Sequence, residues 1–371
     1  MRVGLRALGK QRVWAALAVL LGMSCALFWY AGNTQVQAAA PSAEPLRSYA
    51  DKMHFWFGTA LQGLFWGNAK YTQIVSTQFN SGVSMTLMGQ TQPQPGKYDF
   101  HIIDNQSEFA RKHDMKLFGV ALLYRPGAAG PAWFAESCRT MSKEKMDSLL
   151  KEHIHAVVTR GGDAYYGWEV VNEHLVPGHN GCWSKVLGDP DYIAKAFRYA
   201  REANPKAQLM LNDGFGHDGI DKERAKEFFE LIRKLKADNV PIDVAGTQMH
   251  LRPENLRPTY VEEFKSFIEE ARKVGVQVQV TEMDVMLPPN GGPEMLQKQK
   301  EIFYNILHTC LKDSNCTGFT LWGTGDHLRN ARGGNDPAGD DFWKQRPNIY
   351  DDNLEPKPAY EGILQALKEG R

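Results

Sequence analysis

The sequence predicts a (β/α)8 barrel, also called a TIM barrel, formed by one domain over residues 46–371. Eight short segments rich in β-branched and aromatic residues alternate with eight longer segments of helical periodicity. The only Pro/Ala/Ser-rich linker lies around residues 40–45, so no second domain is expected. A doubly wound open sheet is the alternative, although no glycine-rich nucleotide-binding motif follows the first β segment.

The predicted elements follow one another in strict alternation along the chain. The expected strands are residues 54–60, 83–88, 116–123, 167–173, 208–213, 244–250, 276–285 and 318–326. The expected helices are residues 67–78, 103–113, 142–159, 191–203, 222–237, 260–273, 294–312 and 357–368. Ser142 before the third helix and Pro190 before the fourth are residues that commonly begin helices.

The composition is that of a globular protein without a dominant charge. Lys and Arg number 43, Asp and Glu also number 43, and hydrophobic residues make up 43% of the chain. These values exclude a disordered or fibrous chain. Because the sequence pI is near 7.2, no broad positive field is available for nucleic acid, and we expect no nucleic-acid partner.

The first 40 residues have the pattern of an export signal. Four basic residues, Arg2, Arg6, Lys10 and Arg12, precede an uncharged run over residues 13–32. The polar stretch after it ends in Ala38-Ala39-Ala40, which resembles a signal-peptidase site. We therefore expect a periplasmic or secreted protein. The run is also long enough to cross a bilayer, so an uncleaved N-terminal anchor in the inner membrane is the alternative.

The cysteines outside this leader are even in number. Cys25 lies in the apolar run, and Cys138, Cys182, Cys310 and Cys316 remain. In an oxidising compartment these four suggest two disulfides, of which the close pair Cys310 and Cys316 is one, leaving Cys138 with Cys182. Free buried thiols are the alternative. No Cys/His group has the spacing of a zinc site, so we expect no metal.

Two glutamates are expected at the carboxyl ends of facing strands. The fourth strand ends at Asn172-Glu173, before a loop with Pro177 and Gly178, and the seventh carries Glu282 before Pro288-Pro289. In a barrel the carboxyl ends of the strands hold the chemistry, and the ends of strands four and seven face each other. Two carboxylates across such an opening are suited to glycoside hydrolysis, which requires one acid and one nucleophile or base.

These segments resemble glycoside hydrolase family 10, the xylanase family. The resemblance rests mainly on two segments, Trp168-Glu169-Val170-Val171-Asn172-Glu173 and Val280-Thr281-Glu282-Met283-Asp284-Val285. Further matches occur in order at Phe57-Gly58-Thr59-Ala60, Phe79-Asn80, Leu211-Asn212-Asp213, Gly246-Thr247-Gln248-Met249-His250-Leu251, Gly318-Phe319-Thr320-Leu321-Trp322-Gly323 and Lys357-Pro358-Ala359-Tyr360. The similarity extends over residues 50–368, and the order of the motifs makes the resemblance specific.

The resemblance implies a retaining mechanism without a metal or an organic cofactor. Glu173 would be the acid/base and Glu282 the nucleophile, with carboxyl groups about 5–5.5 Å apart. Asn172 would bind the 2-hydroxyl of the sugar. Gln248 and His250 would reach the nucleophile and the adjacent sugar, and Asp284 would orient His250. Trp322 would form the floor of the subsite at the cleaved sugar.

The chain departs from the family pattern where the family binds xylose units. Met85-Thr86 and Gly89-Gln90 stand where the family carries Glu-Asn and Lys-Trp pairs. Val120 stands in the place of a histidine, Tyr124-Arg125 replaces a Trp-His pair, and Arg329-Asn330 replaces a Ser-Trp pair. Losing several hydrogen-bond donors changes the preferred sugar or weakens its binding. Arg125 could instead contact a carboxylate on an acidic glycan.

We therefore expect a monomeric, retaining, endo-acting β-glycosidase, with endo-1,4-β-xylanase as the default activity on a polysaccharide or oligosaccharide. One alternative keeps the mechanism and changes the substrate to another β-linked glycan, such as a bacterial exopolysaccharide. A second alternative, of another class, is a carbohydrate-binding barrel without turnover. The presence of two glutamates together with Asn172, Gln248 and His250 argues against pure binding.

Overall fold

The computed structural model describes residues 44–62, 66–125, 130–326 and 345–371. The chain divides into residues 1–37 and 38–371, and the fold below is that of the second unit. The predicted leader, residues 1–40, lies outside the described residues, so both predictions for it remain open. Within the described ranges, no helix combines the length and the apolar character needed to cross a membrane.

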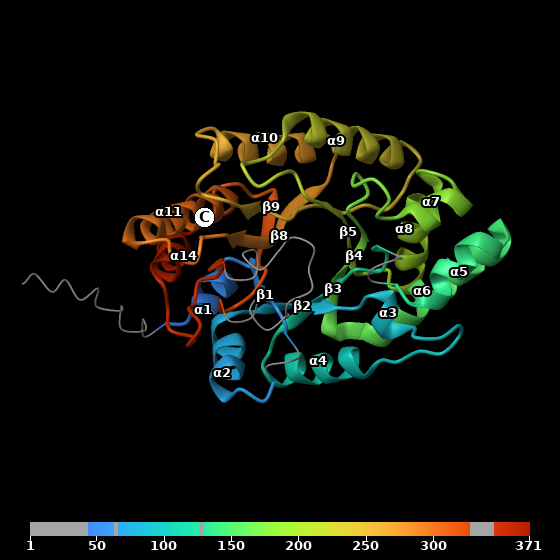
Figure 1. The fold of residues 1–371 in the computed structure, drawn as a ribbon, viewed down its shortest axis with the longest axis horizontal. Coiled ribbons are helices and arrows are strands. Elements are labelled where there is room, and N and C mark those ends of the chain that lie inside the picture. The colour runs from blue at the N-terminus through green and yellow to red at the C-terminus, as the bar shows by residue number, and fades with distance from the viewer. Residues whose placement is uncertain (1–43, 63–65, 126–129, 327–344) are drawn as a thin grey trace, which may run out of the picture. The chain divides into compact units, whose positions relative to one another are not determined.

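Eight parallel strands form a closed barrel, as the sequence predicts (Figure 1). They are β1 (Trp56–Ala60), β2 (Ser81–Met85), β3 (Lys116–Val120), β4 (Tyr165–Asn172), β5 (Gln208–Asp213), β6 (Val244–Thr247), β8 (Gln277–Val285) and β9 (Cys316–Leu321). Neighbours in the sequence are neighbours in the sheet, β1 pairs with β9, and β6 pairs with β8. The two-residue strand β7 (His250–Leu251) pairs with the end of β8.

Helices surround the barrel on its outside (Figure 1). The predicted helices appear as α2 (Ala69–Gln78), α4 (His101–Lys112), α6 (Lys143–Gly161), α8 (Asp191–Ala203), α9 (Lys222–Ala237), α10 (Tyr260–Lys273), α11 (Pro293–Leu311) and α14 (Pro358–Glu369). Among the described residues, four shorter α-helices were not predicted: α1 (Leu46–Lys52), α3 (Met88–Thr91), α5 (Ala132–Thr140) and α7 (Gly181–Leu187). Except for α1, which precedes the first strand, these short helices lie in connections that follow strands.

Several predicted strands extend beyond the residue at which the strand of the structure ends. The expected strand 244–250 is divided because Met249 has a left-handed φ of 59° between β6 and β7. Met88 begins α3 instead of ending the second strand. The expected strand 318–326 ends at Leu321, and its continuation is an irregular segment bridged to Tyr350. The period-two pattern continues beyond these ends, so it could not locate them.

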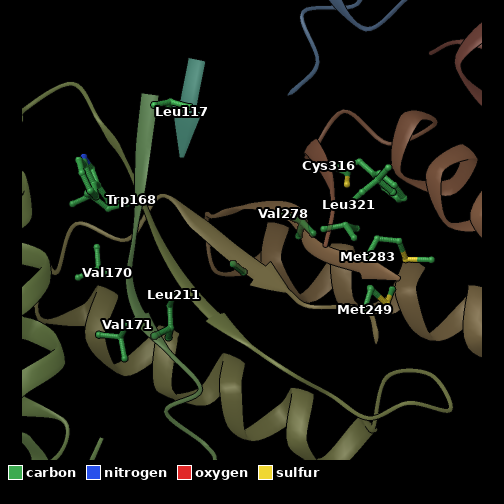
Figure 2. Packing of buried hydrophobic residues seen from close by; sticks show 14 of the residues in the cluster. Leu117, Trp168, Val170, Val171, Leu211, Met249, Val278, Met283, Cys316 and Leu321 are labelled. Atoms are coloured by element: carbon green, nitrogen blue, oxygen red, sulfur yellow. The ribbon is translucent and has the colours of Figure 1, made fainter. Parts of the chain in front are cut away.

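The apolar core has two layers separated by the sheet. The larger cluster lies between strands and helices, where Trp168, Val170, Val171, Leu211 and Val278 pack (Figure 2). The smaller cluster contains Ala60, Val83, Phe118, Val120, Ala121, Met210 and Val244, with Met85, Tyr124, Tyr166 and Trp322 against it. Because its members come from strands and strand ends, this second cluster fills the interior of the barrel. The fold thus gives the site a packed floor.

Glycine at position 119 makes room for the largest buried ring. A Cβ atom on Gly119 would lie 2.2 Å from Cε3 of Trp168. The Trp168 indole is fully buried and stacks on Tyr165 with ring centroids 4.6 Å apart. A larger side chain at position 119 would therefore displace the outer face of β4, which carries the site residues at its carboxyl end.

Both ends of the described barrel chain lie where the strands begin. On α1, Arg47 donates to the carbonyl oxygens of Ser76, His113 and Asp114, which precede β2 and β3. At the other end, the Arg371 guanidinium donates to the carbonyl oxygen of Cys316 at the start of β9. The helices α1 and α14 also pack against each other. The carboxyl ends of the strands, called the mouth below, are on the opposite side.

A buried lysine fixes the segment that follows β9. Lys357 Nζ lies 2.9 Å from Asp326 Oδ2 and donates to the carbonyl oxygens of Arg346 and Asn348. Both charged side chains are at most 6% exposed. Burial lowers the pKa of Lys357, and the charge of Asp326 opposes that shift. This group joins the mouth end of β9 to the residues leading into α14.

Both predicted disulfides are present, Cys138–Cys182 and Cys310–Cys316. The first joins α5 to α7 and the second joins the end of α11 to the start of β9. The pairing agrees with the prediction and rules out the alternative of free thiols at these positions.

Removing the longer disulfide is expected to cost more stability than removing the shorter one. Replacing Cys138 and Cys182 by Ala opens a loop with a separation of 44 residues, against 6 for Cys310 and Cys316. Chain entropy then predicts losses of about 4 and about 2 kcal/mol in the free energy of unfolding. Urea denaturation of the two double variants measures both, and the reverse order would contradict the entropic account.

Candidate active site

Glu173 lies at the mouth, one residue beyond β4. Its backbone has a left-handed φ of 54°, uncommon for a residue other than glycine, and its N–H donates to the carbonyl oxygen of Asn212 at 2.9 Å. Strained backbone of this kind is concentrated at functional sites, where the surrounding structure holds it. The sequence placed Glu173 as the last residue of the strand, whereas β4 ends at Asn172 and Glu173 lies in the turn that follows.

Glu282 lies on β8, which is separated from β4 in the sheet by β5 and β6. Its side chain is 6% exposed and its Oε2 lies 3.3 Å from Nε2 of His250. The other ring nitrogen of His250, Nδ1, lies 3.0 Å from Oδ1 of Asp284. Asp284 therefore orients the His250 ring towards Glu282. Burial raises the pKa of Glu282, and the hydrogen bond and charge of His250 oppose that shift.

Asn212 connects the two glutamate strands. From β5 its Nδ2 reaches Glu282 Oε1 at 3.1 Å and Asn172 Oδ1 at 3.3 Å, while its Oδ1 accepts from Thr281 at 2.9 Å. Asn172 Oδ1 also accepts from Gln248 Nε2 at 3.3 Å. The side-chain carbonyl of Asn172 is thus held by two donors, which leaves the NH2 group of the same side chain to donate to a ligand. Sequence analysis gave Asn212 only as a motif residue, without a role.

The Gln248 side chain contacts Glu173, whereas the sequence predicted a contact with the nucleophile, Glu282. Its Nε2 donates to Glu173 Oε1 at 2.9 Å, so its side chain lies on the expected acid/base. Its contact with Glu282 is through the backbone, where the Gln248 carbonyl accepts from the Glu282 N–H at 3.1 Å. The left-handed residue Met249, next in the chain, separates the directions of Gln248 and His250. In a regular strand, without this left-handed residue, the side chains of Gln248 and His250 would have a different relative orientation.

A third carboxyl group, Glu169, lies inside the barrel below these two. It is completely buried, and its Oε2 accepts from Asn212 Nδ2 at 2.9 Å. Burial, and then the negative charges of Glu282 and Glu173, raise its pKa well above the usual range. Burial and the neighbouring carboxylates thus both disfavour the charged form of Glu169. The motif position of Glu169 does not reveal its burial, so the sequence indicates no role for it.

Aromatic residues line the same end of the barrel. The ring of Trp322, just after β9, lies 6.3 Å from that of His250 and meets it edge to face. Tyr124, beyond β3, packs with Trp322 against the inner core cluster. Both residues thus lie at the mouth, where flat apolar faces suit the packing of a sugar ring.

Arg125 and an unpredicted histidine, His179, flank Glu173. Arg125 Nη2 lies 3.6 Å from Glu173 Oε2, and its guanidinium lies 5.3 Å from the centre of the Tyr124 ring. His179 Nδ1 lies 2.5 Å from the same carboxylate oxygen. No sequence pattern singled out His179, because it belongs to the loop after β4 and to none of the family motifs.

The departures from the family pattern occupy the mouth ends of β2 and β3. Met85 ends β2 and Val120 ends β3, and both belong to the inner apolar cluster or pack against it. Gly89 and Gln90 lie in α3. Arg329-Asn330 lies outside the described residues. Two strand ends where the family places polar side chains are therefore apolar in this chain.

In the described part of the chain, no group of three or more His, Cys, Asp or Glu side chains is arranged to hold a metal ion. The geometry offers instead two carboxyl groups within one hydrogen-bonded network. Glu173 is joined to it through Gln248 and Glu282 through Asn212, and both amides meet at Asn172. Such an arrangement can donate a proton on one side of a bond and supply a carboxylate on the other.

The His250–Asp284 pair is expected to stabilise the fold less at high pH. Burial opposes the charged imidazole, but Asp284 and Glu282 outweigh it and raise the pKa of His250 from 6.5 to about 10. A raised pKa stabilises the folded state fully below pH 6.5, and this stabilisation is lost as the pH rises through about 10. Asp284→Asn should therefore lower the melting temperature most near pH 6, with a difference from wild type that shrinks towards pH 10.

The matched control is Glu262→Gln, which breaks the exposed pair of Glu262 with Lys265. An exposed pair contributes about 0–1 kcal/mol, so its difference in melting temperature should be small at every pH. A pH-independent effect of Asp284→Asn would contradict the raised pKa of His250.

Comparisons with known proteins agree on one family. Residues 46–366 match the family model described as Glycosyl hydrolase family 10. Endo-1,4-beta-xylanase B of Thermotoga neapolitana is 30% identical over 338 residues, covering 88% of this chain and 92% of that protein. Endo-1,4-beta-xylanase A of Thermoanaerobacterium saccharolyticum is a longer protein, of which the match, also 30% identical, covers 26%.

Solved structures give the same result. Xylanase 10B of Thermotoga petrophila RKU-1, in complex with xylobiose, superposes with a TM-score of 0.78 at 29% identity, covering 88% of this chain and 97% of that one. Native xylanase 10B of Thermotoga maritima superposes with a TM-score of 0.77 at 30% identity, covering 88% and 98%. Both similarities extend over the whole barrel and therefore include the mouth with its two glutamates.

Proposed function

The chain belongs to glycoside hydrolase family 10, and we propose that it cuts the β-1,4 linkages of a xylan chain with Glu173 as acid/base and Glu282 as nucleophile. As a member of this family it is a retaining endo-1,4-β-xylanase-like hydrolase, and its substrate is a carbohydrate. The observation that carries the residue assignment is the amide network that holds the two carboxyl groups at the ends of β4 and β8.

The first step breaks the glycosidic bond. Glu173 gives its proton to the glycosidic oxygen, which keeps the electron pair of the broken C–O bond. A carboxylate oxygen of Glu282 forms a new bond to the anomeric carbon. Asn172, held through its carbonyl, donates from its NH2 group to the 2-hydroxyl, and this hydrogen bond strengthens as positive charge develops on the sugar.

The second step restores the enzyme. The carboxylate of Glu173 accepts a proton from water, whose oxygen bonds to the anomeric carbon as the ester to Glu282 breaks. His250 and Asp284 keep the Glu282 carboxylate oriented between the two steps, because the imidazolium lies between two anions. Trp322 and Tyr124 supply apolar faces for the sugar at the mouth.

A second candidate substrate is another β-linked glycan that carries acidic groups. Met85 and Val120 remove polar contacts on one side, while the Arg125 side chain, 42% exposed, presents a cation at the mouth. A guanidinium binds a carboxylate in two parallel hydrogen bonds, so a uronic acid substituent or an acidic exopolysaccharide fits this group.

Product analysis separates these substrates. The purified full chain is incubated with neutral xylan, glucuronoxylan, mixed-linkage glucan and an acidic exopolysaccharide, and products are identified by mass spectrometry, with Glu282→Gln as the control. Xylo-oligosaccharides released by wild type only, from both xylans, support the xylanase. Cleavage of the acidic glycan without cleavage of neutral xylan supports the second candidate. If none of the four polysaccharides is cleaved, both candidate substrates are contradicted.

We also propose that the protein is exported and acts as a monomer. The basic and apolar pattern of residues 1–40 supports export, as do two disulfides, which form in oxidising compartments. Sequencing the N-terminus of the protein recovered from cell fractions tests this: a start near residue 41 in the soluble periplasmic or secreted fraction supports cleavage. An intact N-terminus in the membrane fraction supports the anchor, and an intact N-terminus in the cytoplasm contradicts export. Size-exclusion chromatography with light scattering tests the monomer.

A further inference from the structure

His179 is held beside Glu173 by a loop that is fixed at several points. The N–H of Leu175 donates to Asp213 Oδ2 at 2.9 Å, and Asn180 Nδ2 donates to the backbone carbonyl oxygen of Asn172 at 2.8 Å. The next residues begin α7, whose Cys182 is joined to α5 by a disulfide. The side chain of His179 is only 16% exposed. The contact with Glu173 is therefore built into the loop.

His179 and Glu173 are in direct contact. Their atoms Nδ1 and Oε2 lie 2.5 Å apart. Burial and the charge of Arg125 lower the pKa of His179, against the attraction of Glu173, so the imidazole is neutral at neutral pH. Arg125 Nε, which can only donate, points to the same Nδ1 at 3.3 Å. Nδ1 therefore carries a lone pair, and it faces the Glu173 carboxyl group.

We propose that His179 is a positioning residue of the hydrolytic reaction, which accepts the hydrogen bond of the protonated Glu173 and holds this acid ready for the glycosidic oxygen. The proposal rests on the assignment of Glu173 as acid/base. After the proton has left, the carboxylate faces Arg125 at 3.6 Å, which stabilises the charged form. His179 thus favours the state that donates a proton, and Arg125 favours the state that accepts one.

Other ionisable groups face this pair from the neighbouring elements. They are Tyr124 beyond β3, Glu169 on β4, Asp213 on β5 and Glu282 on β8. Arg224 pairs with Asp213, with Nη2 at 2.7 Å from Oδ1, and burial raises the pKa of Glu169. His250 is the partner of Glu282. Because Asp213 and Glu282 have partners of their own, His179 and Arg125 are the groups whose removal should change the ionisation of Glu173 most.

The test is the pH dependence of kcat/KM on a xylo-oligosaccharide, whose leaving group needs a proton, with an aryl β-xylobioside measured in parallel. In His179→Ala the carboxylic acid loses its acceptor and Arg125 remains, so the alkaline limb should move to lower pH by about one unit. Arg125→Gln should move the same limb to higher pH. Opposite shifts from two neighbouring residues are a result that general loosening of the loop would not give.

His174→Gln is the matched control, because His174 lies on the same loop and bonds to the Tyr192 hydroxyl at 2.8 Å instead of to Glu173. Its alkaline limb should coincide with that of wild type. If His179→Ala fails to fold, as thermal unfolding would reveal, His179→Phe keeps a planar ring without the acceptor and should show the same shift. A limb that stays in place, or moves to higher pH, overturns the proposal for His179.

Failure of the proposed function would look different. If Glu173→Ala keeps the alkaline limb, the assignment of Glu173 as acid/base is wrong and the role of His179 falls with it. If Glu173→Ala loses the limb while His179→Ala leaves it in place, the acid/base assignment stands and the inference about His179 alone is overturned.

Discussion

Replacing Glu282 by Gln is expected to reduce kcat by about 10⁴-fold or more, the largest effect of any substitution considered for this enzyme. The amide keeps the size of the side chain, and its oxygen can still accept from Asn212 Nδ2. It cannot supply the negative oxygen that forms the ester with the anomeric carbon. Binding should persist, because the aromatic faces and Asn172 remain. Steady-state kinetics and calorimetric titration with an oligosaccharide measure the two quantities.

Glu263→Gln serves as the matched control for a buried glutamate. Glu263 is 4% exposed, is bound by Arg257 and lies on α10, outside the mouth. Its loss should lower stability and leave kcat near that of wild type. If Glu282→Gln retained substantial turnover, or if it lost binding together with turnover, the nucleophile assignment would not survive.

Replacing Glu173 by Ala is expected to reduce kcat/KM by about 10²–10⁴-fold on substrates whose leaving group needs a proton. Substrates with an acidic phenol as leaving group should lose much less in the first step, because their oxygen departs as an anion. The alkaline limb of the pH profile should disappear, since no group remains whose deprotonation removes the acid. Comparing natural oligosaccharides with aryl glycosides over a range of pH measures both effects.

The control for this variant is Glu355→Ala, an exposed glutamate paired with Lys70. It should behave as wild type on both substrate classes. Equal losses on good and poor leaving groups in Glu173→Ala would indicate a general disturbance of the mouth, and the acid/base role would then have to pass to another residue.

The barrel and the place of the two glutamates could be predicted from the sequence for a simple physical reason. Buried parallel strands are short apolar runs, and the chain leaves each run at the same side of the sheet, so Glu173 and Glu282 had to lie at one end. Their distance along the chain did not matter. The two disulfides were predictable for a similar reason, because four cysteines in an oxidising compartment leave few pairings.

The contacts within the site were harder to predict because they depend on single backbone angles and on burial. The left-handed residues Glu173 and Met249 direct the side chains around them, and a period-two pattern assumes that no such residue occurs. Gln248 consequently lies on Glu173 instead of Glu282. Complete burial raises the pKa of Glu169, and composition cannot reveal that burial. His179 comes from a loop without periodicity.

The positions of Arg47 and Arg371, both bonded where strands begin, have a practical consequence for the use of this enzyme. A resin, a fused domain or a cell-surface carrier attached beyond either end of the barrel would join it on the side away from the mouth. The strand ends that carry Glu173 and Glu282 would then face the medium. An immobilised form should therefore keep access to long polymers.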